Sequence, residues 1–123
     1  MWIITKIGFF SIIQKPWNIS TGTLTIRARV RSDLEGLKAY LTDMSDIVES
    51  HDSDYKFRAV AERGAVEAAI AALIADIGYS NFKSEVAATV GYARAAVYSD
   101  VWHDLYRLQS GQYEEHPAPP LML

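Results

Sequence analysis

The stretch TLTIRARVR, residues 23–31, alternates apolar and polar residues with almost no exception. This period of two predicts a β-strand with one face toward a core and the other toward solvent. The apolar face carries Leu24, Ile26, Ala28 and Val30. The polar face carries two threonines followed by Arg27, Arg29 and Arg31, so the sequence predicts a row of three cations on one side of a sheet.

The residues before this strand predict a hairpin or a bulged strand. Segments 2–6 and 9–14 are rich in isoleucine and aromatic residues, and they meet at Gly8. They form either two short strands or one long strand with a glycine bulge. Pro16 cannot donate a backbone hydrogen bond, so we expect the strand to end there and residues 15–22 to form a turn.

The residues after the strand predict a helix and a further strand. Ser32 and Glu35 match a capping box, which predicts a helix over residues 33–41. Residues 54–60 alternate again, which predicts a fourth strand. Its two expected faces are Tyr55, Phe57 and Ala59 on one side, and Lys56, Arg58 and Val60 on the other.

The C-terminal half predicts two more helices. Residues 62–77 are rich in alanine and predict a helix that Gly78 closes in the left-handed conformation. Ser80 or Asn81 caps a longer helix that runs to about Gln109, and Gly91 bends or breaks it. Its expected buried stripe is Phe82, Val86, Val90, Ala93, Val97, Val101, Leu105 and Leu108. The residues that we expect in the core are Leu24, Ile26, Phe57, Ile70, Leu73, Val97 and Val101.

The order of these elements predicts a single α+β domain over residues 1–109. We expect a mostly antiparallel sheet of three to four strands with about three helices packed on one face. No glycine-rich phosphate loop joins a strand to a helix, which argues against a doubly wound nucleotide-binding fold. Residues 110–123 contain three prolines and no hydrophobic period, so we expect a disordered or loosely docked C-terminal tail.

The composition excludes several classes of protein. The chain has no cysteine, which excludes disulfides and thiolate zinc sites. The formal net charge of −3 disfavours a nucleic-acid partner, although a local basic patch could still act alone. No apolar run reaches the roughly 18 residues of a membrane span, and the apolar N-terminus lacks the basic start of a signal peptide. We therefore expect a cytoplasmic protein with no membrane partner.

Five segments, taken in order, resemble a known group of proteins. They are MWIITKIGFFSII, IRARV, DYKFRA, IGYSNFK and VWHDLYRLQ, spread over residues 1–109. This ordered set resembles a family of small uncharacterised bacterial and phage-borne proteins. The resemblance implies a compact bacterial domain and, because the family occurs in mobile elements, a role in conflict between phage and host. It implies no activity and no site residue.

The polar motifs predict no catalytic, metal or cofactor site. Asp100 and His103 are three residues apart on a helix, but no second pair supplies the further ligands that a metal needs. His51 lies among carboxylates, yet no nucleophile or oxyanion hole accompanies it. The acidic linker, residues 43–54, lacks the glycine and the spacing of a calcium loop. We therefore expect a protein that is not an enzyme and that holds no cofactor.

The basic residues of the two alternating strands are the candidate binding site. Its five members are Arg27, Arg29, Arg31, Lys56 and Arg58. If the two strands are neighbours, these side chains converge on a sheet face that the helices leave uncovered. Two interpretations stay open. Either the acidic linker folds over and pairs with the cations, or the face binds the carboxylates or phosphates of a partner.

The expected function is that of a small non-enzymatic binding protein with a protein partner, such as a phage-derived inhibitor of a host defence or nucleic-acid-processing complex. One alternative is a small enzyme that binds a nucleotide or phosphate on the basic face, with His51 or His103 as acid or base. Another is a regulatory nucleic-acid-binding module. Two helix faces suit a homodimer as well as internal packing. One is an alanine-rich face with Ala68, Ala72 and Ala75, and the other is an aromatic ridge with Tyr98, Trp102 and Tyr106.

Overall fold

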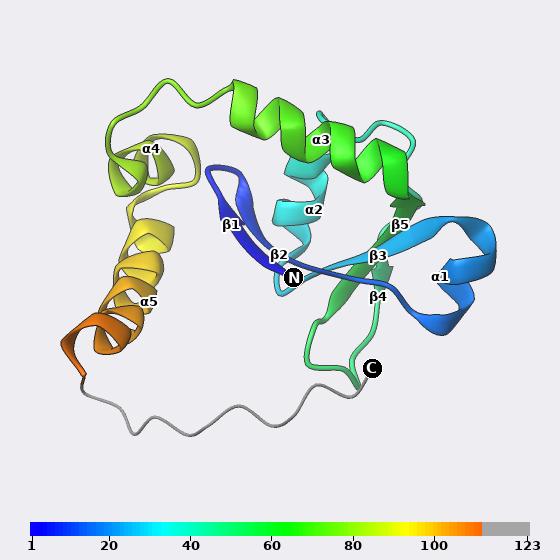
Figure 1. The fold of residues 1–123 in the computed structure, drawn as a ribbon, viewed down its shortest axis with the longest axis horizontal. Coiled ribbons are helices and arrows are strands. Elements are labelled where there is room, and N and C mark those ends of the chain that lie inside the picture. The colour runs from blue at the N-terminus through cyan, green and yellow to red at the C-terminus, as the bar shows by residue number, and fades with distance from the viewer. Residues whose placement is uncertain (112–123) are drawn as a thin grey trace.

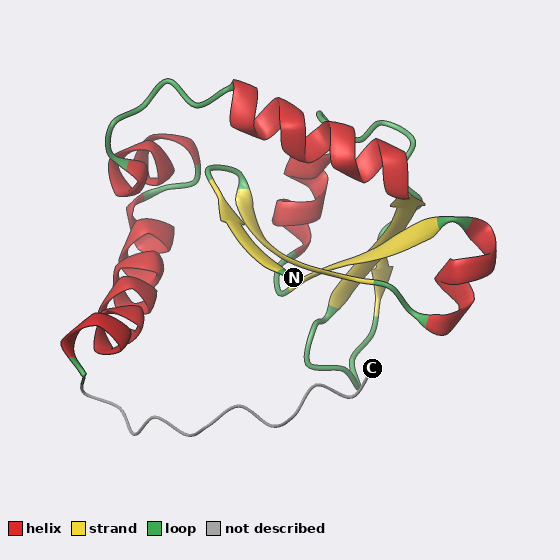
Figure 2. Ribbon diagram, in the orientation of Figure 1, coloured by secondary structure: helices red, strands yellow, loops and turns green. Residues whose placement is uncertain are grey.

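The computed structural model describes residues 1–111, which form one antiparallel five-stranded sheet and five helices (Figures 1 and 2). The strands lie in the order β1-β2-β3-β5-β4, so β3 is central and β1 and β4 are the edge strands. Their bounds are β1 (Trp2–Thr5), β2 (Gly8–Ile13), β3 (Thr23–Ala28), β4 (Val48–Glu49) and β5 (Phe57–Glu62). The predicted α+β class with an antiparallel sheet is confirmed, and the two-residue strand β4 adds to the strands that the sequence predicts.

Two of the helices cover one face of the sheet. The helices are α1 (Pro16–Thr21), α2 (Arg31–Leu37), α3 (Arg63–Ala75), α4 (Phe82–Thr89) and α5 (Tyr92–Ser110). Both α2 and α3 pack against β3 and β5, and Figure 1 shows α3 running across the upper end of α2. Apolar side chains from these two helices and from the sheet form the core: Phe10, Ile12, Ile26, Ala28, Leu34, Leu37, Ala59, Ala61, Val66 and Ala69. Burial of this apolar surface is the main term that holds the two layers together.

The strand register places specific residues side by side on the opposite face. Ser11 of β2 lies opposite Arg27 of β3, and Arg27 lies opposite Arg58 of β5. Directly opposed residues of antiparallel strands point to the same face of a sheet. These three side chains therefore form a row across β2, β3 and β5, away from the face that α2 and α3 cover.

Residues 16–21 form a helix where the sequence predicts a turn. Pro16 takes the first helical position, where its missing N–H costs nothing, and Gly22 ends the helix with a φ of +65°. Asn18 of this helix is buried, and its Oδ1 accepts hydrogen bonds from the Lys15 N–H and the Thr25 hydroxyl, both at 2.8 Å. Asn18 thereby ties α1 to β3.

The predicted bounds of the next two helices are wrong at several ends. α2 begins at Arg31 with extended Val30 as its N-cap, so no capping box forms and the helix ends at Leu37. Its start is fixed by a tertiary contact instead, because the buried Asp33 accepts the Phe9 N–H at 3.0 Å. α3 ends at Ala75, followed by a right-handed cap at Asp76, and Gly78 does not adopt the left-handed conformation.

Gly91 divides the last predicted helix into α4 and α5. Asn81 caps α4 by accepting the Ser84 N–H at 2.9 Å, and Gly91 breaks the chain direction with a φ of +105°. Because the helix is broken, its predicted apolar stripe does not stay buried as a whole, and 55% of Val97 is exposed. Among the expected core residues, Ile26 and Leu73 are buried, whereas Leu24, Phe57, Ile70 and Val101 are half-buried.

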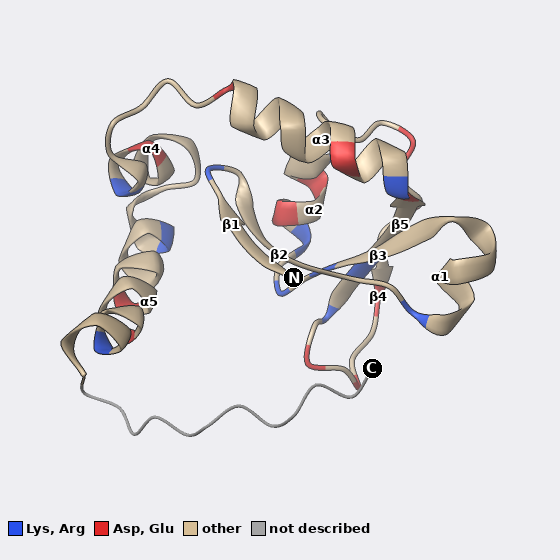
Figure 3. Ribbon diagram, in the orientation of Figure 1, with Lys and Arg blue, Asp and Glu red and all other residues tan. Residues whose placement is uncertain are grey.

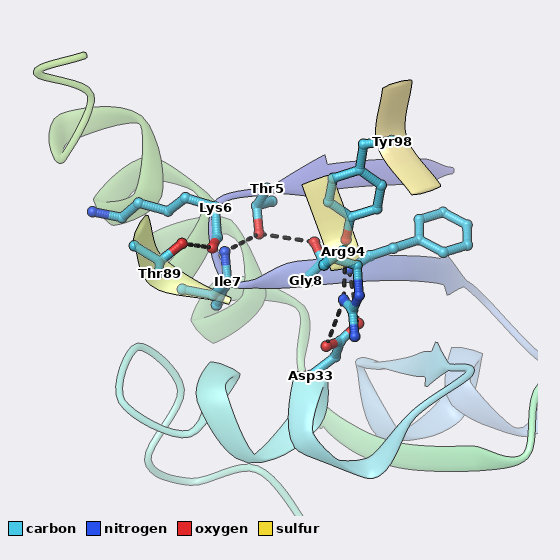
Figure 4. A network of polar contacts seen from close by, with 9 residues as sticks. Thr5, Lys6, Ile7, Gly8, Asp33, Thr89, Arg94 and Tyr98 are labelled. Atoms are coloured by element: carbon cyan, nitrogen blue, oxygen red, sulfur yellow. Dashed lines mark hydrogen bonds and ion pairs between the residues drawn. The ribbon is translucent and has the colours of Figure 1, made fainter. Parts of the chain in front are cut away.

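The first turns of α5 are held to the domain by a buried ion pair (Figure 4). Arg94 Nη1 lies 2.9 Å from both carboxylate oxygens of Asp33 and donates to the Tyr98 hydroxyl at 3.1 Å. Asp33 is 2% exposed, and Tyr98 is the buried residue of α5. Burial raises the pKa of the Tyr98 hydroxyl, and the neighbouring guanidinium opposes that shift. A second tether joins the end of α4 to the hairpin turn between β1 and β2, where the Thr89 hydroxyl donates to the Lys6 carbonyl at 2.6 Å.

Two further predictions concern the C-terminal tail and membrane spans. The predicted tail, residues 110–123, lies outside the described residues from residue 112 onward, and Ser110 is the last residue of α5. Within residues 1–111, no helix combines the length and the apolar composition that a membrane span requires.

Candidate functional site

Three arginines gather on the sheet face opposite α2 and α3, and we call Arg27, Arg29 and Arg58 the arginine face. Arg27 and Arg58 are directly opposed on β3 and β5, and Arg27 Nη2 donates to the Ser11 hydroxyl at 2.6 Å. Figure 3 shows the basic segments of β3 and β5 next to one another. Like charges opposed across two strands cost about 0.2–1 kcal/mol. The fold therefore maintains an electrostatically unfavourable pair at its centre.

Tyr55 lies against two of these guanidinium groups. Its ring centroid is 4.5 Å from Cζ of Arg27 and 4.5 Å from Cζ of Arg29, and the residue is 2% exposed. A cation over an aromatic ring contributes about 0.5–2 kcal/mol, depending on how far the pair is desolvated. The tyrosine ring and the aliphatic stems of the arginines thus cover the part of the sheet that no helix covers.

The prediction that Tyr55 shares a face with Phe57 is wrong. β5 begins at Phe57, so Tyr55 belongs to the bend before the strand and does not follow the alternation. One hydrogen bond joins this bend to the residue that follows β3, and a second lies within the bend. Arg29 Nη1 donates to the Asp54 carbonyl at 2.7 Å, and the Ser53 hydroxyl donates to the Tyr55 carbonyl.

The arginine face has no carboxylate partner within residues 1–111. None of the ion pairs there includes Arg27, Arg29 or Arg58. In the same part of the chain, three buried side-chain nitrogen or oxygen atoms lack a hydrogen-bond partner, and all three belong to this cluster: Arg27 Nε, Arg58 Nε and the Tyr55 hydroxyl. A buried unsatisfied polar group costs about 1–3 kcal/mol. An anion on this face would offset the positive charge and accept hydrogen bonds from the exposed guanidinium of Arg29.

The other two predicted site residues do not join the cluster. Arg31 lies on α2, where its Nε is 3.1 Å from Glu35 of the same helix. Lys56 pairs with Glu49 of the acidic linker at 3.4 Å. The internal-pairing interpretation therefore holds for Lys56, whereas the described linker residues contribute only a backbone carbonyl, that of Asp54, to the arginine face.

Aromatic side chains that were not predicted as site residues extend the arginine face toward β1. The Phe9 ring is 6.4 Å from the Tyr55 ring, and the Trp2 ring stands edge-on to Phe9 at 6.0 Å. The hairpin register pairs Ile4 with Phe9 and Trp2 with Ser11, which puts all four residues on the face of Arg27. Pairing the two predicted N-terminal strands about Gly8 would have revealed this row.

The histidines do not form a reactive centre in the described part of the chain. His51 is exposed and lies 3.5 Å from Glu49, and His103 packs edge-on against Trp102 at 5.0 Å. Within residues 1–111, no three acidic or histidine side chains gather as metal ligands do. Among the described residues, the arginine face is therefore the best candidate for a functional site, and its chemistry suits the binding of an anion.

No family model, curated protein or solved structure matches the chain.

Proposed function

We propose that this chain is a small non-enzymatic binding protein whose arginine face binds the carboxylates of a protein partner. The observation that carries the proposal is the cluster of Arg27, Arg29 and Arg58 around buried Tyr55, without a carboxylate partner within residues 1–111. A guanidinium group presents several donors in a planar fork that fits a carboxylate with two hydrogen bonds. Such a face would also suit a phage-derived inhibitor of a host complex.

Three considerations favour a protein partner over the alternatives. Binding to a nucleic-acid backbone depends on contacts with many phosphates along its length, which three arginines on a chain of net charge −3 do not supply, whereas a short acidic segment needs few contacts. The rings of Trp2 and Phe9 beside the arginines supply apolar contact surface of the kind found at protein interfaces. An enzyme would need a nucleophile paired with a general base, and the Ser11 hydroxyl at this face accepts from Arg27 and has no histidine or carboxylate partner among the described residues.

The proposal is tested with a labelled hexaglutamate peptide as the probe. We expect it to bind the wild-type protein, with salt-dependent affinity, and to shift the side-chain Nε–H NMR signals of Arg27 and Arg58. Arg29→Glu should weaken binding by tenfold or more, because a hydrogen bond to a charged group contributes about 1.5–3 kcal/mol. The matched control is Arg31→Glu, which makes the same change of charge two residues away, on α2 and outside the arginine face.

Two outcomes would contradict the proposal. If Arg31→Glu weakens binding as much as Arg29→Glu, the effect is one of overall charge and not of the arginine face. If oligothymidylate or inorganic phosphate binds through the same signals while hexaglutamate does not, the site is a phosphate site. Circular dichroism of both variants checks that each one folds.

A further inference from the structure

An apolar groove lies beside the arginine face, between strand β1 and helix α5. Its volume is about 450 Å³. Trp2, Ile4 and Phe9 line it from the sheet, and four residues of α5 line it from the other side, namely Val97, Tyr98, Val101 and Leu105. Trp2 is 74% exposed, and Leu105 is 58% exposed. Large apolar side chains that face one another across an open groove mark a surface whose burial by a partner is favourable.

The groove is continuous with the arginine face through Arg29. Arg29 is the charged residue among the described residues that line the groove, and its guanidinium carbon lies 4.5 Å from the Tyr55 ring. Phe9 also belongs to both, because it lines the groove and contacts Tyr55. No carboxylate is among these lining residues. The groove is therefore apolar along its length and positive where it meets the arginines.

The backbone of β1 offers hydrogen bonds along the same groove. Met1 and Ile12 exchange both backbone hydrogen bonds, each at 2.8 Å. In an antiparallel pair these bonded positions alternate with unbonded ones, so Trp2 and Ile4 direct their N–H and C=O groups away from β2. β1 is an edge strand, and no described strand pairs with that side. An extended peptide can add to such an edge as a further strand.

We infer that this groove takes an extended segment of the partner protein, one in which apolar residues adjoin acidic residues. The inference rests on the proposed function and names the part of the partner that is recognised. The segment adds to the edge of β1 through Trp2 and Ile4, and its apolar side chains enter the groove opposite α5. Its carboxylates reach Arg29 and the rest of the arginine face.

The test compares two synthetic peptides that differ in their apolar residues. The first is acetyl-EELTLTL-amide, and the control is acetyl-EESTSTS-amide, which has the same charge. NMR titration of the full-length protein should give a dissociation constant at least tenfold lower for the leucine peptide, with shifts of the Trp2 and Ile4 amide signals. Val97→Asp should remove this advantage, because the position lies in the groove. Leu108→Asp, on the same helix and 61% exposed, is the matched control and should not.

The outcomes separate this inference from the proposed function. If both peptides bind equally and Val97→Asp changes neither, the groove is not a recognition site, whereas the carboxylate-binding function stands. If neither peptide binds, the proposed function fails. If sedimentation velocity shows a wild-type dimer that Val97→Asp converts to a monomer, a second copy of this chain fills the groove and the inference is overturned.

Discussion

Replacing Asp33 with alanine is expected to destabilise the fold severely, because this side chain connects three elements. Its carboxylate accepts the Phe9 N–H of β2 and pairs with Arg94 of α5, while the residue itself lies in the first turn of α2. Alanine would leave the Arg94 guanidinium without its partner and the Phe9 N–H without an acceptor. Both groups are partly or wholly removed from water, so water cannot replace the lost hydrogen bonds unless the structure rearranges.

The magnitude follows from the burial of the two partners. Removing one member of a buried ion pair costs about 3–5 kcal/mol. The Arg94 side chain is 21% exposed and can recover part of its hydration, which favours the lower end of that range. The unsatisfied Phe9 N–H adds about 1 kcal/mol. We expect a loss of about 4 kcal/mol in the free energy of unfolding, or roughly 15 °C in the melting temperature for a domain of this size.

Urea denaturation followed by tryptophan fluorescence measures this loss, and the slope m should stay unchanged if two-state unfolding is preserved. Asp33→Asn keeps an acceptor for the Phe9 N–H and removes the charge, so it should fall between wild type and Asp33→Ala. Asp33→Asn and Arg94→Met together form a double-mutant cycle, in which we expect a coupling energy between the two side chains above about 1 kcal/mol. A loss below about 1 kcal/mol for Asp33→Ala, with m unchanged, would refute the reasoning.

Two further predictions concern a close approach and a titrating group. Gly8→Ala should lose about 1–3 kcal/mol, because the added Cβ would lie 2.4 Å from Asp33 Cγ, whereas Gly64→Ala, which meets nothing within 4 Å on α3, should be neutral or stabilising. A urea titration in which both variants unfold alike would contradict this. The Tyr40 hydroxyl donates to Asp76 at 2.7 Å, and that hydrogen bond raises the pKa of Tyr40. Because the protonated form is the one stabilised, its contribution is complete below about pH 10 and is lost as the pH rises through the raised pKa. Raising the pH through 10 should therefore lower the free energy of unfolding less in Tyr40→Phe, which lacks this hydrogen bond, than in Tyr92→Phe, which keeps it. Equal losses in the two variants would show that the hydrogen bond has no such effect.

Local patterns were enough to predict much of the sheet and part of the site. The alternation in residues 23–31 identified β3, and Gly8, Asn81 and Gly91 marked real ends of elements, because each acts through its own backbone or side chain. Two of the three members of the arginine face lie on β3 or directly after it, within that same stretch. These features depend on interactions between residues that are close in the sequence.

The remaining features depend on contacts between distant residues. Tyr55 reached the arginine face because β5 begins two residues after it, and no local pattern distinguishes that bend from the strand. The register that opposes Arg27 and Arg58 joins positions 31 residues apart. The start of α2 depends on Phe9, and the placement of α5 depends on the bond between Asp33 and Arg94, which are 61 residues apart. Short-range periodicity carries no information about such pairs.

The attachment of α5 near its first turns makes the helix a lever. Arg94 lies 16 residues before Ser110, a distance of about 24 Å along the axis at 1.5 Å per residue. A rotation of about 10° at this pivot would move the far end by about 4 Å, and Leu105, which lies between the two, by about 3 Å. The separation between α5 and β1 therefore depends on attachments near the start of the helix, namely the ion pair between Asp33 and Arg94 and the hydrogen bond from Thr89 to Lys6, and a small rotation about them would be amplified into a larger change in the width of the groove.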